Sequence, residues 1–163
     1  MNQNVTSAEA QAYRLEQVYE QLASELNQPG VRQRLQTASG ETEWSVTQVL
    51  GHMVEMIPYW LTHCRTLLAT TGSPPPFGRA LDAPERLAGV AHGQAATLDA
   101  LMGRLKTEIS IAAGMMRRLS PAERNQKGIH NRRGEMTVAE VLEALIVAHA
   151  EEHLAQVRQT LQT

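Results

Sequence analysis

The chain has 163 residues and a formal net charge of −2. Its length is typical of one domain spanning residues 1–163, and its near-neutral charge, without blocks of one sign, argues against a nucleic-acid or membrane-surface binder. The single cysteine, Cys64, excludes an internal disulfide, which favours a reducing cytoplasm, and neither a signal-peptide pattern nor an apolar run of about 18 residues is present.

The first predicted helix begins at Thr6 or Ser7, because Thr6 and Glu9 have capping-box spacing. Its apolar residues recur at helical intervals: Leu15, Val18, Leu22 and Leu26. The residues Pro29 and Gly30 then end the helix.

A second helix is predicted over residues 46–69. Ser45 and Gln48 have capping-box spacing at its start, and Gly72 follows its end. One broad face of this helix carries His52 among apolar neighbours.

The next segment, residues 72–84, is rich in proline and glycine and is long enough for a crossover connection. Asp82 is the expected N-cap of the helical pattern that follows, over residues 83–119. A single helix of that length would reach about 55 Å, whereas the second helix spans about 40 Å. We therefore expect a break near Gly89 or Gly93, with the main third helix starting close behind it.

A short helical turn is expected at residues 121–124, followed by a polar loop as far as Glu135. Thr137 and Glu140 have capping-box spacing and start a last amphipathic helix over residues 137–159. No segment shows a convincing strand pattern. Four long helices predict an all-α four-helix bundle with a long crossover between the second and third helices.

The last helix carries His149 and His153, which lie four residues apart on one face and can bind one metal ion. His52 supplies a third ligand if its helix and the last helix are antiparallel, because the three residues then lie at similar heights. Three protein ligands leave one position for water or substrate, as in catalytic zinc sites. The alternative is three unrelated histidines in the core.

Two segments, EWSVTQVLGHMVEMIPYW and AHAEEHLAQVRQTL, resemble the DinB-like superfamily, which includes bacillithiol and mycothiol S-transferases and mycothiol-dependent maleylpyruvate isomerases. The resemblance covers the whole chain. It implies an up-down-down-up bundle, often dimeric, with a divalent metal, usually zinc or nickel, bound by His52, His149 and His153. Iron also accepts imidazole ligands, so the identity of the metal stays open.

A divalent ion on three histidines lowers the pKa of bound water or binds a thiol as thiolate. The leading hypothesis is therefore a metal-dependent transferase that activates a low-molecular-weight thiol. The alternatives are a metal-dependent hydrolase and a non-enzymatic, metal-stabilised binding protein of the stress response. Glu55 and Glu152 lie near the ligands and are candidates for orienting a histidine or moving a proton, although either can equally be an ordinary helix residue.

The predicted topology places residues 28–44 and 78–93 at the same end of the bundle as the metal site. Trp44 and His92 are the candidates there for contact with substrate. The basic run at residues 130–133 is expected at the opposite end, where we interpret it as a solvated loop.

Overall fold

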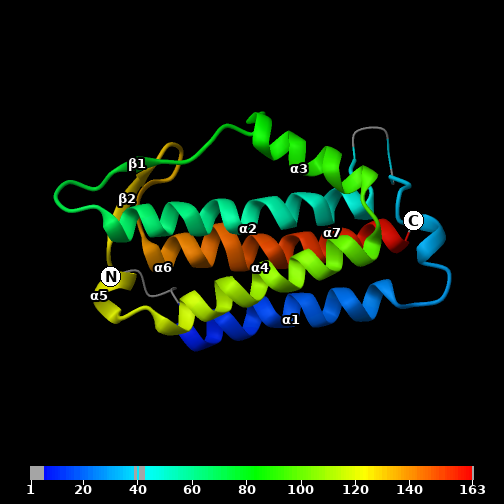
Figure 1. Ribbon diagram of the computed structural model, residues 1–163, viewed down its shortest axis with the longest axis horizontal. Coiled ribbons are helices and arrows are strands. Elements are labelled where there is room, and N and C mark those ends of the chain that lie inside the picture. Colours follow the sequence, from blue (N-terminus) through cyan, green and yellow to red (C-terminus); the bar gives the residue numbers. More distant parts are fainter. Residues whose placement is uncertain (1–5, 39, 41–42, 163) are drawn as a thin grey trace.

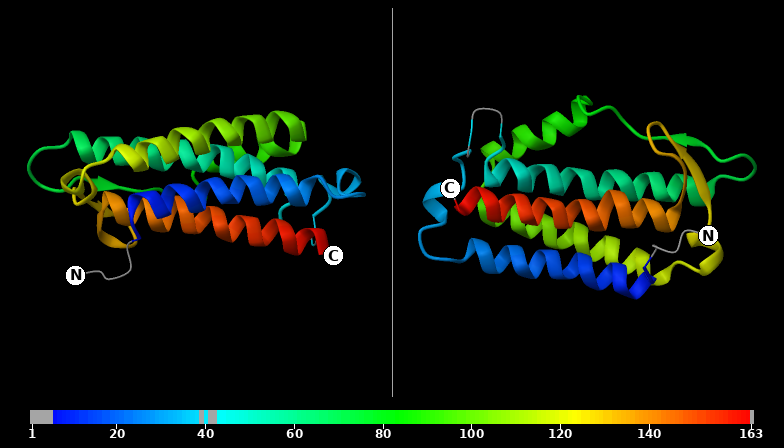
Figure 2. Two further views of the ribbon diagram at one scale, coloured as in Figure 1. Left: turned by 90° about the horizontal axis from the view of Figure 1, so that it is seen from below. Right: turned by 180° about the vertical axis from the view of Figure 1, so that it is seen from behind.

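Four long helical segments lie side by side in the computed structural model, which describes residues 6–38, 40 and 43–162 (Figure 1). They are α1 (Ala8–Leu26), α2 (Val46–Ala69), α4 (Leu98–Arg118) and a last helix composed of α6 (Val138–Val141), η2 (Leu142–Val147) and α7 (Ala148–Gln162). The segment α1 and the last helix run in one direction, and α2 and α4 run in the other (Figures 1 and 2). The predicted all-α, up-down-down-up bundle is confirmed. Across the described ranges, no helix combines the length and apolar character needed to cross a membrane.

Capping side chains start the helices largely where the sequence predicts. Both hydrogen bonds of the capping box at Ser45 and Gln48 are present, as are those at Thr137 and Glu140. At α1 the N-cap is Ser7, whose hydroxyl accepts the backbone N–H of Ala10. The expected capping box of Thr6 is therefore wrong, because the Thr6 hydroxyl instead donates to Glu143 of η2.

The crossover from α2 to α4 contains β1 (Pro76–Phe77) and α3 (Pro84–Ala95). The expected N-cap Asp82 is wrong: α3 begins after Ala83, without a side-chain cap, and the fixed φ of Pro84 suits its first position. The break before α4 lies at Ala96 and Thr97 rather than at Gly89 or Gly93. There the hydroxyl of Thr97 caps the new helix by accepting the backbone N–H of Ala100.

Gly89 and Gly93 lie inside α3, where the absence of a side chain allows the backbone of α3 to approach the backbone of α2 closely. A Cβ atom on Gly51 of α2 would collide with the carbonyl oxygen of Gly89 and lie 2.5 Å from Cα of Gly93. A Cβ atom on Gly93 would collide with the carbonyl oxygen of Thr47. This contact holds α3 against the turn of α2 that carries His52.

We expect Gly93→Ala to lower the free energy of unfolding by about 2 kcal/mol, because the methyl group has only backbone to displace. For a chain of this size the melting temperature should fall by about 4–8 °C. Gly103→Ala is the matched control, since Gly103 lies in α4 with nothing within 4 Å of the added methyl group. That variant should gain up to about 1 kcal/mol from helix propensity. Thermal unfolding followed by circular dichroism measures both, and a Gly93→Ala variant as stable as wild type would contradict this account.

A small three-stranded sheet replaces the polar loop expected before the last helix. The strands β2 (Lys127–His130) and β3 (Gly134–Thr137) form an antiparallel hairpin, and β1 joins β2 in parallel, with Phe77 opposite His130. The prediction of no strand was wrong because each strand has four residues or fewer. Such strands are too short to produce a recognisable alternation, and β1 pairs with a segment about fifty residues later.

The last helix contains a π-helical segment that the sequence did not predict. This segment, η2, ends at Val147, two residues before His149. A π turn holds more residues than an α turn and is frequent at functional sites. The π segment therefore changes the direction in which the following side chains, including His149, point around the helix axis relative to those of residues 137–141.

Candidate metal centre

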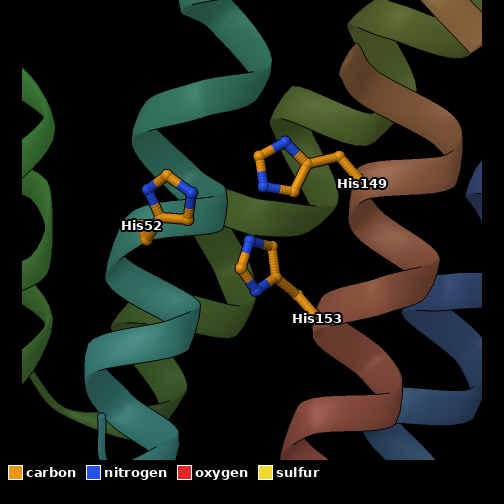
Figure 3. Close-up of side chains that lie close together, drawn as sticks. All are labelled: His52, His149 and His153. Atoms are coloured by element: carbon orange, nitrogen blue, oxygen red, sulfur yellow. The ribbon is translucent and has the colours of Figure 1, made fainter. Parts of the chain in front are cut away.

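The imidazole rings of His52, His149 and His153 come together inside the bundle. Figure 3 shows the rings of His149 and His153 pointing from α7 toward His52 on α2. One nitrogen from each ring lies within 4.8 Å of the other two. A tetrahedral ion with bonds of about 2.1 Å needs nitrogens about 3.4 Å apart, and rotation of the rings can close this difference.

Three nitrogens of His52 and His153 are buried without the hydrogen bonds that buried polar groups normally make. Among the described residues, neither Nδ1 nor Nε2 of His52 has a partner, and nor does Nε2 of His153. Each such group costs about 1–3 kcal/mol. The other nitrogen of His153, Nδ1, lies 2.9 Å from Oε1 of Gln156, an acceptor that holds the proton on Nδ1 and leaves the Nε2 lone pair free. This arrangement fits a metal ion.

All three histidines are held in their neutral form, which is the form that binds metal. Burial, with smaller contributions from His153 and His149, lowers the pKa of His52 to about 2. Burial also lowers the pKa of His149 to about 4, helped by His153 and by the positive charge of Arg86. The pKa of His153 is likewise lowered by burial, against an opposing contribution from Gln156.

A cavity of about 180 Å³ lies beside His52 and His149. Its wall includes four arginines, one carboxylate and an apolar side chain: Arg79, Arg86, Arg132, Arg133, Glu152 and Leu145. A molecule in the cavity would therefore meet two of the three histidines and a strongly cationic wall.

The two carboxylates predicted to assist the chemistry have different surroundings. Glu152 lines the cavity, as its position beside His153 suggested. Glu55 does not line it: its two oxygens accept hydrogen bonds of 2.5 and 2.7 Å from Arg79. The guanidinium of Arg79 also stacks on Tyr59, 3.9 Å from the ring centroid. The chemical roles of both glutamates stay predictions, and the contacts of Glu55 assign it to holding Arg79 in place.

The two residues predicted to contact substrate, Trp44 and His92, also differ in their positions relative to the histidine cluster. The ring of Trp44 lies 5.2 Å from that of His52 and is stacked 6.4 Å from that of His153, so it covers one side of the cluster. The guanidinium carbon of Arg86 lies 5.2 Å from the centroid of this indole. His92 is exposed on α3 and does not line the cavity.

The basic run at residues 130–133 lies at the site, and its assignment to the opposite end was wrong. The hairpin starts at the far end of the bundle but folds back on the same side of α2 as α3 (Figure 1). Arg132 and Arg133 thereby reach the cavity. Nothing in the sequence alone indicated that Arg79 and Arg86 would meet this turn at one cavity.

Comparisons with known proteins agree with this fold. A family model described as the DinB superfamily matches residues 11–157. YfiT from Bacillus subtilis, described as a probable metal-dependent hydrolase with an unusual four-helix bundle topology, aligns with a TM-score of 0.79 at 17% identity over 99% of this chain and 91% of its own. A mycothiol-dependent maleylpyruvate isomerase aligns with a TM-score of 0.71 at 13% identity over 93% of this chain and 61% of its own.

A protein from Streptococcus pneumoniae aligns with a TM-score of 0.73 at 14% identity over 99% of this chain and 94% of its own. No curated protein matches the sequence. At these identities the structural likeness concerns the fold alone.

Proposed function

We propose, since this chain belongs to the DinB superfamily, that its three histidines form a divalent metal centre that activates a low-molecular-weight thiol for transfer to an electrophile. One observation carries the proposal: neutral, buried and unpartnered imidazole nitrogens converge beside a cavity lined by guanidinium groups. A divalent ion there supplies Lewis acidity, which favours the deprotonated form of a thiol at neutral pH. Zinc and nickel are the expected metals, and iron is also compatible with imidazole ligands.

The side chains around the cavity support an anionic nucleophile. The positive charges of Arg86, Arg133 and Arg79 all contribute to lowering the pKa of His149, so their field reaches the cluster. The same field favours a thiolate over a neutral thiol. Among the described residues, Glu152 is the one carboxylate on the cavity wall, and we assign it the role of accepting the thiol proton.

The two alternatives are metal-dependent hydrolysis and a non-enzymatic, metal-stabilised binding protein of the stress response. Each makes a different demand on the site, because hydrolysis needs no thiol and a binding protein needs no turnover. A homodimer is the expected form of the protein in solution, and light scattering during gel filtration measures it.

The thiol hypothesis is tested with cobalt-substituted protein titrated with cysteine. We expect a new near-ultraviolet absorption, as sulfur coordination to cobalt produces, in wild type but not in His149→Ala. Glu152→Gln should keep cobalt, but it should need a higher pH to develop this absorption and should react about 100-fold more slowly with 1-chloro-2,4-dinitrobenzene at pH 7, because it lacks the acceptor for the thiol proton.

An unchanged cobalt spectrum on thiol addition would contradict the thiol hypothesis. If that protein hydrolysed p-nitrophenyl acetate in a metal-dependent way, hydrolysis would take its place. If it did neither, the binding-protein alternative would be favoured.

A further inference from the structure

We propose that the cavity contains an anion-recognition subsite in which Arg86, Arg132 and Arg133 bind a carboxylate or phosphate group of a small-molecule substrate. The inference deepens the proposed function and rests on it in taking the cavity as the place where the substrate binds. It adds the chemical class of the substrate and the residues that select it.

The first support is that these three guanidiniums have no carboxylate partners among the residues that the structure describes. Arg86, Arg132 and Arg133 form no ion pair with any carboxylate in the described part of the chain. Elsewhere in the bundle Arg14 and Arg117 each bind two carboxylates. Arg79, the fourth arginine of the cavity, is paired with Glu55 and is therefore not assigned to the subsite.

The second support is the environment of Arg86, which is half-buried and held in a defined position. Its Nη1 donates a 2.7 Å hydrogen bond to the carbonyl oxygen of Leu81, and its guanidinium lies over the ring of Trp44. Burial lowers the pKa of Arg86, and the positive charges of Arg79 and Arg132 lower it further. An anion bound among these cations would offset both their desolvation and their mutual repulsion.

The third support is the rigidity of the turn that carries Arg132 and Arg133. Nδ1 of His130 accepts the backbone N–H groups of both arginines at 3.1 Å. The His130 side chain is buried, with ring centroids 5.2 Å from Phe77 and 5.8 Å from Trp60. Because the backbone of this turn is already ordered, ligand binding costs side-chain entropy but little backbone entropy.

The charges on the cavity wall also indicate how a ligand would be oriented in the cavity. The cavity, at about 180 Å³, is smaller than the roughly 300–1,000 Å³ of pockets for drug-sized ligands, so it suits a small metabolite. Guanidinium groups bind carboxylate and phosphate oxygens in pairs of parallel hydrogen bonds. Glu152 on the same wall repels an anion, so the anionic group should lie toward Arg132 and Arg133. The rest of the molecule then extends toward His149.

The test is calorimetric titration of the metal-loaded protein with succinate and, separately, with inorganic phosphate at low ionic strength. Three proteins are compared: wild type, Arg132→Gln/Arg133→Gln, and the control Arg65→Gln/Arg118→Gln. The control removes the same charge from two exposed arginines that do not line the cavity. We expect the turn variant to bind at least about tenfold more weakly than wild type and control, with wild-type binding weakened by salt.

Tighter binding of succinate would identify a carboxylate substrate, and tighter binding of phosphate would identify a phosphorylated one. Equal affinity in all three proteins, or no binding to wild type at about 10 mM anion, would overturn the proposal. Metal content is measured on the same samples. A protein that holds no metal but loses anion affinity in the turn variant would refute the proposed metal chemistry while supporting the anion subsite.

Discussion

Replacing His52 with alanine is expected to reduce the bound metal from about one equivalent per chain to near zero, since only two ligands remain. Loss of a supporting residue alone typically costs about 10–100-fold in metal affinity, so loss of a ligand should cost more than that. The measurement is mass spectrometry of untagged protein purified without a nickel column. His149→Ala should behave like His52→Ala, whereas His92→Ala is the matched control, because His92 is exposed and outside the cavity.

Thermal unfolding provides a second readout of the same change. Metal at 100 times its dissociation constant should stabilise wild type by about 2.7 kcal/mol, whereas it should leave the melting temperature of His52→Ala unchanged. A full equivalent of metal in His52→Ala would remove that residue from the ligand set. Low metal in wild type, His52→Ala and His92→Ala alike would indicate that the cluster is not a metal site.

Acidification is expected to destabilise the metal-free protein steeply between pH 6.5 and about 4. In the folded protein the pKa of His52 is lowered to about 2 and that of His149 to about 4 from the usual 6.5. Below pH 6.5 the unfolded chain therefore binds more protons than the folded chain, and stability falls as the pH falls. The slope is at most about 1.4 kcal/mol per pH unit for each of these histidines.

Urea unfolding of the metal-free protein at pH 7, 6 and 5 measures this dependence. The contribution of His149 should end near pH 4, whereas that of His52 should continue toward pH 2. His52→Ala should show a shallower dependence than wild type, because one of the titrating groups is gone. Equal unfolding free energies at pH 7 and pH 5 would show that the buried histidines do not control acid stability.

The helices and the histidine cluster were predictable because their signals are local. The capping boxes at Ser45 and Thr137 lie within four residues of sequence and appear in the structure as both hydrogen bonds. The heights of His52, His149 and His153 along their helices follow from residue counts, once the helices are placed antiparallel. The observed cluster agrees with this inference.

Other local signals were misleading because tertiary contacts overrode them. Gly89 and Gly93 resemble helix breaks, but they lie within α3 because they permit its close contact with α2. Thr6 has the spacing of a capping residue, yet its hydroxyl donates to Glu143 on the last helix. In both cases a partner far away in the sequence decides the role of the residue.

The helical periodicity, the order of the helices and the three histidines on their inner faces could all be predicted from the sequence, because each depends on spacing within one segment. The hairpin, the π segment before His149 and the meeting of Arg86, Arg132 and Arg133 at one cavity became visible only in the folded chain. Strand pairing and convergence of like charges depend on contacts between distant segments. Such contacts leave no periodic trace in the sequence, and here they define the cationic wall of the cavity.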